Sequence, residues 1–296
     1  MSAEPLLAAA GRALGRRVEG AASVAGGDIN QAWALELEGG RRAFLKSRAD
    51  APDDEYAAEA AGLRWLAEPG GLPVPEVLAV IEAGDVRGLA LEWVEPGRLG
   101  EAGDEELGRG LASTHAAGAE GFGALPPASP REVLRFGGVE IPSGGNGSEP
   151  TWAEVYAGRL ERLGRVALDR GRISARCAAR VDAVVERLGE LGGPAEPPAR
   201  VHGDLWSGNV HAGADGRPWL IDPAAHGAHR ELDLAMLRLF GTVSARTLAA
   251  YEDVAPLAPG HQERVGLWQL QPLLVHAVLF GGSYGAAVER TAARYA

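Results

Sequence analysis

The segment from His202 to Asp222, HGDLWSGNVHAGADGRPWLID, constrains the fold of this chain more than any other feature. Asn209 follows Asp204 by five positions, and Asp222 comes thirteen positions later, at the end of a short apolar run. This spacing is that of a kinase catalytic loop leading into a metal-binding aspartate. The segment therefore predicts a kinase-like phosphotransferase.

The residue types in this segment suit phosphoryl transfer. The transferred γ-phosphoryl group spreads negative charge over oxygens that Mg²⁺ must bridge, and Mg²⁺ prefers oxygen ligands. Asn209 and Asp222 are the candidate metal ligands, and they predict Mg²⁺ and ATP as cofactors. The acceptor hydroxyl must lose its proton near the moment of attack, so a carboxylate has to lie within hydrogen-bond reach. Asp204 is the candidate base, while His202 is interpreted as a buried histidine that braces the loop.

Lys46 is the only lysine in the chain, because the other 28 of its 29 basic residues are arginines. It lies in RRAFLKS, an apolar run that predicts a strand. Thirteen residues later, Glu59 lies at the start of a segment with helical spacing, AAEAAGLRWLA. A strand lysine paired with a helix glutamate is the kinase arrangement that orients the α and β phosphates of ATP. Lys46 and Glu59 are therefore candidate ATP-binding residues.

Two further segments are candidates for nucleotide binding. Gly26 and Gly27 enter an alternating run upstream of Lys46, where a turn between two strands would let backbone amides approach the phosphates. The segment LEWVEPG predicts a hinge, in which backbone groups of Glu92, Trp93 and Val94 would bind the adenine edge. Neither G-x-G-x-x-G nor the P-loop pattern occurs, which removes the Rossmann and P-loop interpretations.

Size and charge limit the remaining classes. A chain of 296 residues with 46% hydrophobic content can bury a large core. The net charge of −11 argues against nucleic-acid and anionic-membrane partners, which would be repelled. No apolar run is long enough to span a membrane, and the first residues lack the pattern of a signal peptide, so we expect a cytoplasmic protein. The single cysteine, Cys177, rules out an internal disulfide.

The order of predicted elements indicates an α+β protein with two lobes. Residues 1–95 predict a small lobe with an antiparallel sheet and one main helix, and residues 96–296 predict a larger, mostly helical lobe. Residues 123–150, rich in Gly, Pro and Ser, predict a loop or a lid. Only about eight residues separate Asp222 from the helical run ELDLAMLRLFG, which leaves no room for the long activation loop of a protein kinase. The acceptor is then a small molecule, or a small group displayed on a larger one.

These motifs carry a resemblance to a known family. GGDIN, FLK, EAAGLRWL, VPEVL, LALEWV, LASTH, HGDLWSGN, IDPA, HRELDLAMLRLFG and FGGSY together resemble the fructosamine kinase (ketosamine-3-kinase) family, in the aminoglycoside-phosphotransferase-like branch of the kinase fold. The resemblance implies the roles given above for Asp204, Asn209, Asp222, Lys46 and Glu59. It also implies phosphorylation of the 3-hydroxyl of sugar-amine adducts, which makes the adduct unstable and frees the amine.

The same resemblance implies a structural task for Asp233, which would hold the catalytic loop through its backbone amides. His115 is expected to pack against that loop. The chain departs from the family where it has His226 and Gly227 in place of aromatic residues, and where QPLLVH keeps only His276 of a longer motif. The family's Thr-Pro-Gln segment is also missing from residues 123–150.

These departures leave the acceptor open. A ketosamine on a protein or in free form is one hypothesis, and an aminoglycoside, choline-like or amino-alcohol acceptor of another small-molecule kinase is the alternative. Five side chains are candidates for contact with the acceptor, each with packing as the competing interpretation. They are Trp206, His229, Arg230, Trp268 and His276.

Overall fold

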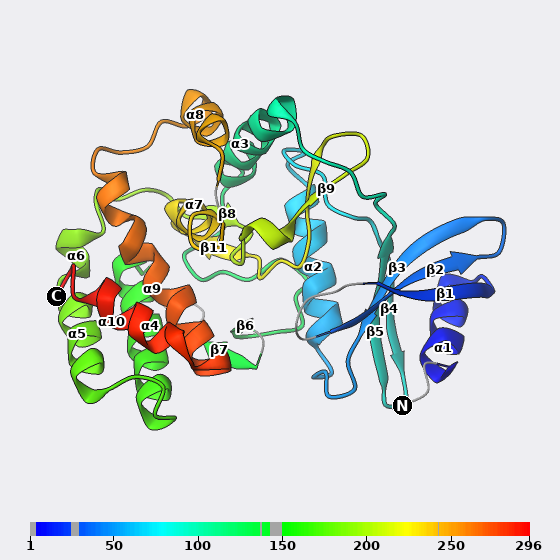
Figure 1. Cartoon of the computed structure of the whole chain (residues 1–296), viewed down its shortest axis with the longest axis horizontal. Helices are drawn as coiled ribbons and strands as arrows, with labels where there is room; N and C mark the ends of the chain where they lie inside the picture. Colours follow the sequence, from blue (N-terminus) through cyan, green and yellow to red (C-terminus); the bar gives the residue numbers. More distant parts are fainter. Residues whose placement is uncertain (1–3, 25–29, 137, 143–149, 242) are drawn as a thin grey trace.

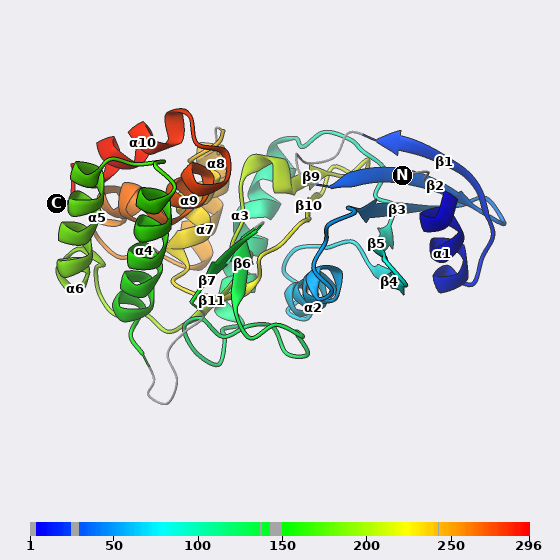
Figure 2. The same ribbon diagram turned by 90° about the horizontal axis from the view of Figure 1, so that it is seen from below.

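A five-stranded antiparallel sheet lies at one end of the molecule, and a group of long helices lies at the other (Figures 1 and 2). The computed structural model describes residues 4–24, 30–136, 138–142, 150–241 and 243–296. The strands, in their spatial order, are β1 (Val18–Val24), β2 (Gln31–Leu37), β3 (Arg41–Ser47), β5 (Val86–Glu92) and β4 (Val77–Ala83). Successive side chains of a strand point to opposite faces, and apolar residues occur on both faces of this sheet, so each face needs a covering layer.

Two helices cover the two faces of the sheet. Helix α1 (Glu4–Leu14) packs on one face, in a cluster that includes Leu45 and Ala90. Helix α2 (Glu55–Ala67) packs on the other face, against the neighbouring positions Leu89 and Leu91. The prediction placed Glu59 near the start of its helix, but the helix begins one turn earlier, so Glu59 lies within it.

The remainder of the chain is mostly helical. Its helices are α3 (Glu101–Ala116), α4 (Trp152–Asp169), α5 (Ala175–Glu186), α6 (Leu188–Leu191), the 3₁₀ helix η1 (Ser207–Asn209), α7 (Glu231–Leu237), α8 (Ala245–Val254), α9 (His261–Phe280) and α10 (Ser283–Ala292). Helices α4, α5, α9 and α10 enclose the largest apolar cluster, which includes Leu160, Val181, Leu274 and Val288. The prediction of an α+β, kinase-like fold is confirmed.

Among the described residues, this part of the chain also contains three pairs of short antiparallel strands. They are formed by β6 (Leu134–Phe136) with β7 (Val139–Ile141), β8 (Ala199–Val201) with β11 (His226–Ala228), and β9 (Val210–Ala212) with β10 (Pro218–Leu220). The first lies in the segment predicted as a loop or lid, of which residues 137 and 143–149 fall outside the described residues. Strands β8 and β11 flank the catalytic segment and bring its two ends together, whereas β9 and β10 form a hairpin within it. Within the described residues, no helix is long and apolar enough to cross a membrane.

Candidate active site

A cavity of about 610 Å³ brings together the residues that the sequence singled out. Lys46 and Glu59 reach it from β3 and α2, and Asp204, Asn209 and Asp222 reach it from the catalytic segment. The two groups are separated by well over a hundred residues in the chain. Their convergence on one cavity is what the catalytic hypothesis requires.

Lys46 holds the two sides of the site together. Its side chain is buried, and its Nζ lies 2.6 Å from Glu59 Oε2 and 2.6 Å from Asp222 Oδ1. Burial alone would lower the pKa of the Lys46 ammonium, but the charges of Asp222 and Glu59 outweigh burial and raise it above its usual value. The predicted ion pair between the strand lysine and the helix glutamate is confirmed. An ammonium fixed in this way presents a positive charge to the cavity.

Asp222 sits in an unusual backbone conformation. Its φ is +53°, a left-handed value that few residues other than glycine adopt, although aspartate is one of the more tolerant. Such conformations cost free energy and persist where the surrounding structure determines them, often at active sites. Burial would raise the pKa of the Asp222 carboxyl, but the charge of Lys46 outweighs burial and the net shift is downward. The carboxylate is therefore held ionised, as a metal ligand must be.

Asn209 and Asp204 lie in hydrogen-bond contact. Asn209 Nδ2 donates to the backbone oxygen of Asp204 at 2.8 Å and to its Oδ2 at 3.4 Å. Because the amide nitrogen is used in this way, the amide oxygen of Asn209 is left as an acceptor. Burial, with the nearby charge of Asp222, raises the pKa of Asp204 to about 6. A carboxyl with a raised pKa accepts a proton more readily than an ordinary aspartate.

The donor set fits a magnesium ion. Asn209 and Asp222 line the same cavity and offer an amide oxygen and a carboxylate, which are hard oxygen ligands. The unshared oxygen of Asp222 is available, because Lys46 takes only Oδ1. Mg²⁺ is bound by few protein ligands together with substrate phosphates, so two side chains are sufficient.

Asp233 holds the catalytic loop in place through hydrogen bonds to its backbone. This buried carboxylate accepts from the backbone N–H of His202 at 2.7 Å and from that of Gly203 at 2.9 Å. His115 Nε2 lies 3.2 Å from the same carboxylate, and the ring of His202 contacts the backbone oxygen of Ile221 at 2.9 Å. The structural tasks predicted for Asp233 and His202 are confirmed, whereas His115 contacts the anchoring carboxylate of Asp233 rather than the loop itself.

Replacing Asp233 with alanine is expected to lower the free energy of unfolding by about 3 kcal/mol, because two buried N–H groups lose their acceptor at about 1–3 kcal/mol each. Urea unfolding followed by circular dichroism measures this difference. The matched control is Asp253→Ala, at an exposed position on α8, which should change stability by less than about 0.5 kcal/mol. Equal unfolding midpoints for the two variants would show that the carboxylate does not hold the loop.

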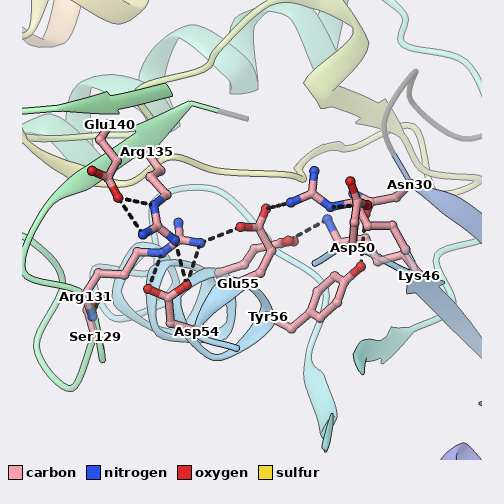
Figure 3. Close-up of polar contacts among 12 residues, drawn as sticks. Asn30, Lys46, Asp50, Asp54, Glu55, Tyr56, Ser129, Arg131, Arg135 and Glu140 are labelled. Carbon is pink, nitrogen blue, oxygen red and sulfur yellow. Dashed lines mark hydrogen bonds and ion pairs between the residues drawn. The ribbon is translucent and has the colours of Figure 1, made fainter. Parts of the chain in front are cut away.

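A segment preceding α4 reaches across to the start of α2 (Figure 3). Arg131 Nη2 lies 2.5 Å from Glu55 Oε2, and Arg135 Nη1 lies 3.0 Å from Asp54 Oδ1. Both arginines also line the cavity. These residues were not predicted from the sequence, because nothing local in it pairs two arginines of a Gly- and Pro-rich segment with acids about eighty positions earlier.

The predicted nucleotide segments have mixed outcomes. Gly26 and Gly27 lie outside the described residues. The hinge segment follows β5, but the backbone N–H of Glu92 donates to Glu76 at 2.8 Å and so is not free to bind adenine. The guanidinium carbon of Arg42 lies over the ring of Trp93, 4.0 Å from the centroid of that ring. Neither Glu92, Trp93 nor Val94 is among the residues that line the cavity.

Two of the five acceptor candidates line the cavity. Trp206 is 38% exposed and lies close to Asp204 in the chain, and His276 comes from α9. The His276 and Phe240 rings lie 4.6 Å apart, and the Tyr284 ring lies 5.1 Å from His276. Together with Phe280 they form an aromatic wall of the cavity. Phe240, Phe280 and Tyr284 were not predicted as site residues, although they lie in the LFG and FGGSY segments that carry the family resemblance.

The other three acceptor candidates lie elsewhere. Trp268 is 1% exposed, in the core, and its Nε1 donates to Glu231 at 2.8 Å. His229 stacks on Trp268, and Arg230 binds Glu196 at 2.6 Å. None of the three lines the cavity, so they have the packing role. Trp268 and His276 lie eight residues apart on α9, and eight residues turn a helix by about 80° beyond two full turns, so one ring lies in the core and the other lines the cavity.

The sheet, the lysine–glutamate pair and the catalytic loop define a phosphotransferase of the protein-kinase-like fold. A macrolide 2′-phosphotransferase from Brachybacterium faecium shares this fold, with a TM-score of 0.63 and 20% identity over 99% of this chain and 98% of that one. The chain itself belongs to the fructosamine kinase family, whose profile matches residues 7–295. It is therefore a kinase.

Individual relatives agree with this membership. A protein from Thermobifida fusca, assigned as a fructosamine-3-kinase, has a crystal structure with a TM-score of 0.87 and 40% identity, covering 98% of both chains. A Synechocystis protein assigned as a ketoamine kinase is 34% identical over 275 residues, which are 90% of this chain and 87% of the relative. The similarity thus extends over almost the whole chain.

Proposed function

We propose that this protein transfers the γ-phosphoryl group of ATP to the 3-hydroxyl of ketosamines, the sugar-amine adducts that form on amines and lysine side chains. The observation that carries the proposal is the convergence of Lys46, Asp204, Asn209 and Asp222 on one cavity, in a chain of the fructosamine kinase family. The names of its relatives, which refer to ketoamine and fructosamine, support this acceptor class.

In the proposed reaction each side chain has one task. Lys46, held by Glu59 and Asp222, binds and orients the phosphates of ATP. The oxygen of the acceptor hydroxyl bonds to the γ-phosphorus, and the bond from that phosphorus to the bridging oxygen of ADP breaks. Asp204 accepts the proton that the hydroxyl loses. Mg²⁺, when bound by Asn209 and Asp222, would neutralise the negative charge of the phosphates. The phosphorylated adduct is unstable and releases the free amine, which would repair a glycated amine.

The aromatic wall supports an acceptor that combines a sugar with an amine. Flat rings such as Trp206 bind the apolar faces of sugars, and aromatic faces also attract ammonium groups. The rings of Phe240, Phe280 and Tyr284 lie on the same side of the cavity as His276. A protonated secondary amine next to a ketose offers both features.

A coupled ADP-release assay tests the proposal with a panel of acceptors. Fructosyl-, ribulosyl- and erythrulosyl-amines are compared with kanamycin and choline at equal concentrations. We expect turnover with the sugar-amines that exceeds the rate with water alone by at least about a hundredfold, because positioning the acceptor hydroxyl accounts for much of kinase catalysis. Turnover with kanamycin or choline, but with none of the sugar-amines, would contradict the ketosamine assignment and support another small-molecule kinase.

A further inference from the structure

Arg159 on α4 is a fully buried cation without an acidic partner among the described residues. Its Nη1 lies 3.0 Å from Nε2 of His226 and 3.3 Å from Oε1 of Gln271, and its Nε and Nη2 have no hydrogen-bond partner in the described structure. The guanidinium lies 5.3 Å from the ring centroid of Trp152. Removing a charge from water without an opposite charge beside it costs several kcal/mol. The presence of a buried arginine at this cost in free energy suggests that its hydrogen bonds have a specific role.

The contacts of Arg159 fix the state of His226. A guanidinium only donates hydrogen bonds, so Nε2 of His226 must accept, and the ring proton must be on Nδ1. That Nδ1 lies 2.7 Å from the backbone oxygen of Ala224, to which it donates. Burial, together with the charge of Arg159, lowers the pKa of His226 to about 3, so the ring stays neutral. The result is a directed chain of hydrogen bonds from Arg159 through His226 to Ala224.

This series of hydrogen bonds ends between the catalytic loop, which carries Asp204, and the turn that carries Asp222. Ala224 comes two residues after Asp222, whose left-handed backbone has to be held by its surroundings. A Cβ added to Gly203 would lie 2.9 Å from the His226 ring and would collide with the Ala224 oxygen. Gly203 immediately precedes Asp204, and its φ of +83° also requires glycine. His226 therefore touches the catalytic loop and the metal-ligand turn at once.

We propose that Arg159 and His226 are positioning residues, which hold the turn carrying Asp222 in register with the catalytic loop carrying Asp204. Arg159 acts through His226, and neither side chain lines the main cavity. The inference rests on the proposed function in one respect, because it assigns a metal-ligand role to Asp222. The sequence agrees with this proposal. The family resemblance leads us to expect an aromatic residue at position 226, and such a residue could not make the hydrogen bonds that His226 makes with Arg159 and Ala224.

The decisive variant is the double substitution Arg159→Met with His226→Phe. It removes the buried cation together with its hydrogen-bond chain, while an unbranched apolar side chain and an aromatic ring fill most of the space. Replacing buried charged groups by apolar ones of similar volume is often neutral or stabilising, so we expect an unchanged or higher melting temperature. We expect the KM for Mg²⁺ to rise about tenfold or more, as is typical when groups that orient a metal ligand are lost.

Amide hydrogen exchange gives a second measurement that does not depend on activity. In the metal-free protein, peptides covering residues 220–226 should exchange faster in the double variant than in the wild type, while the peptides of α9 should be unchanged. The matched control is Tyr156→Phe, which removes hydrogen bonds to Leu267 and Gln271 from the same core without touching either loop. It should lower the melting temperature and leave both the KM for Mg²⁺ and the exchange of residues 220–226 as in the wild type.

The results separate the possible failures. Unchanged exchange and an unchanged KM for Mg²⁺ in a folded double variant would overturn the positioning proposal. If the double variant does not fold, Arg159→Met alone removes the buried cation, leaves the His226–Ala224 hydrogen bond in place and is subject to the same two measurements. Should the wild-type protein transfer phosphate to no acceptor, the proposed function fails, and the exchange comparison still decides whether Arg159 and His226 hold the turn.

Discussion

Replacing Asp204 with asparagine is expected to lower kcat by about a thousandfold, because the acceptor hydroxyl loses the group that takes its proton, and general bases contribute about 10² to 10⁴. The substitution keeps the shape of the side chain and the hydrogen-bond geometry around Asn209. Because Asp204 does not contact Lys46 in the structure, the KM for ATP should change little. Steady-state kinetics with the best sugar-amine acceptor measure both constants.

Two controls accompany this prediction. Asp215→Asn, at an exposed position between β9 and β10, should have wild-type kinetics. The melting temperature of Asp204→Asn should equal or exceed that of the wild type, since burial raises the pKa of this carboxyl and its ionised form is unfavourable in the folded protein. A loss of less than about tenfold in kcat would remove Asp204 from the role of base.

Replacing Lys46 with methionine should lower kcat/KM for ATP by at least about a hundredfold, because the proposed reaction assigns the phosphates to this single lysine of the chain and such charge-assisted contacts are strong. Lys46→Arg is not a conservative control, because a planar guanidinium does not fit between two carboxylates at 2.6 Å. The methionine variant should also be less stable, since Glu59 is left as a buried charge without its partner.

A double-mutant cycle separates the two effects. Adding Glu59→Gln to Lys46→Met removes the uncompensated carboxylate, so the melting temperature should recover while activity stays low. Strict additivity of the two substitutions in stability would show that the ion pair is not formed in solution. Recovery of activity in the double variant would show that the ammonium has no part in binding the phosphates.

The parts of the site that could be predicted from the sequence are those whose chemistry is local. The residues Asp204, Asn209 and Asp222 lie within one segment of the chain, and their spacing is that of the catalytic loop and metal-binding aspartate of kinases. The pairing of Lys46 with Glu59 was also predictable, because a strand lysine followed by a helix glutamate is the kinase arrangement. Asp233 followed from the family resemblance.

The parts that could not be predicted depend on contacts between distant segments. Arg131 meets Glu55 because the segment before α4 returns to the start of α2, and no periodicity reports such a return. The burial of Trp268 depends on how α9 is rotated in its bundle, which a helical pattern defines only to within a side chain or two. The unpaired Arg159 is the extreme case, since composition and spacing favour an exposed arginine.

The chemical structure of the reaction product tests most directly whether this protein phosphorylates the 3-hydroxyl of ketosamines. The protein is incubated with ATP, Mg²⁺ and fructosyl-lysine, and the product is examined by correlated ¹H and ³¹P NMR. We expect a phosphorus resonance coupled to the proton on carbon 3 of the ketose, which disappears in the Asp204→Asn variant. A product phosphorylated at another oxygen, or inorganic phosphate released from ATP with the ketosamine unchanged, would contradict this expectation.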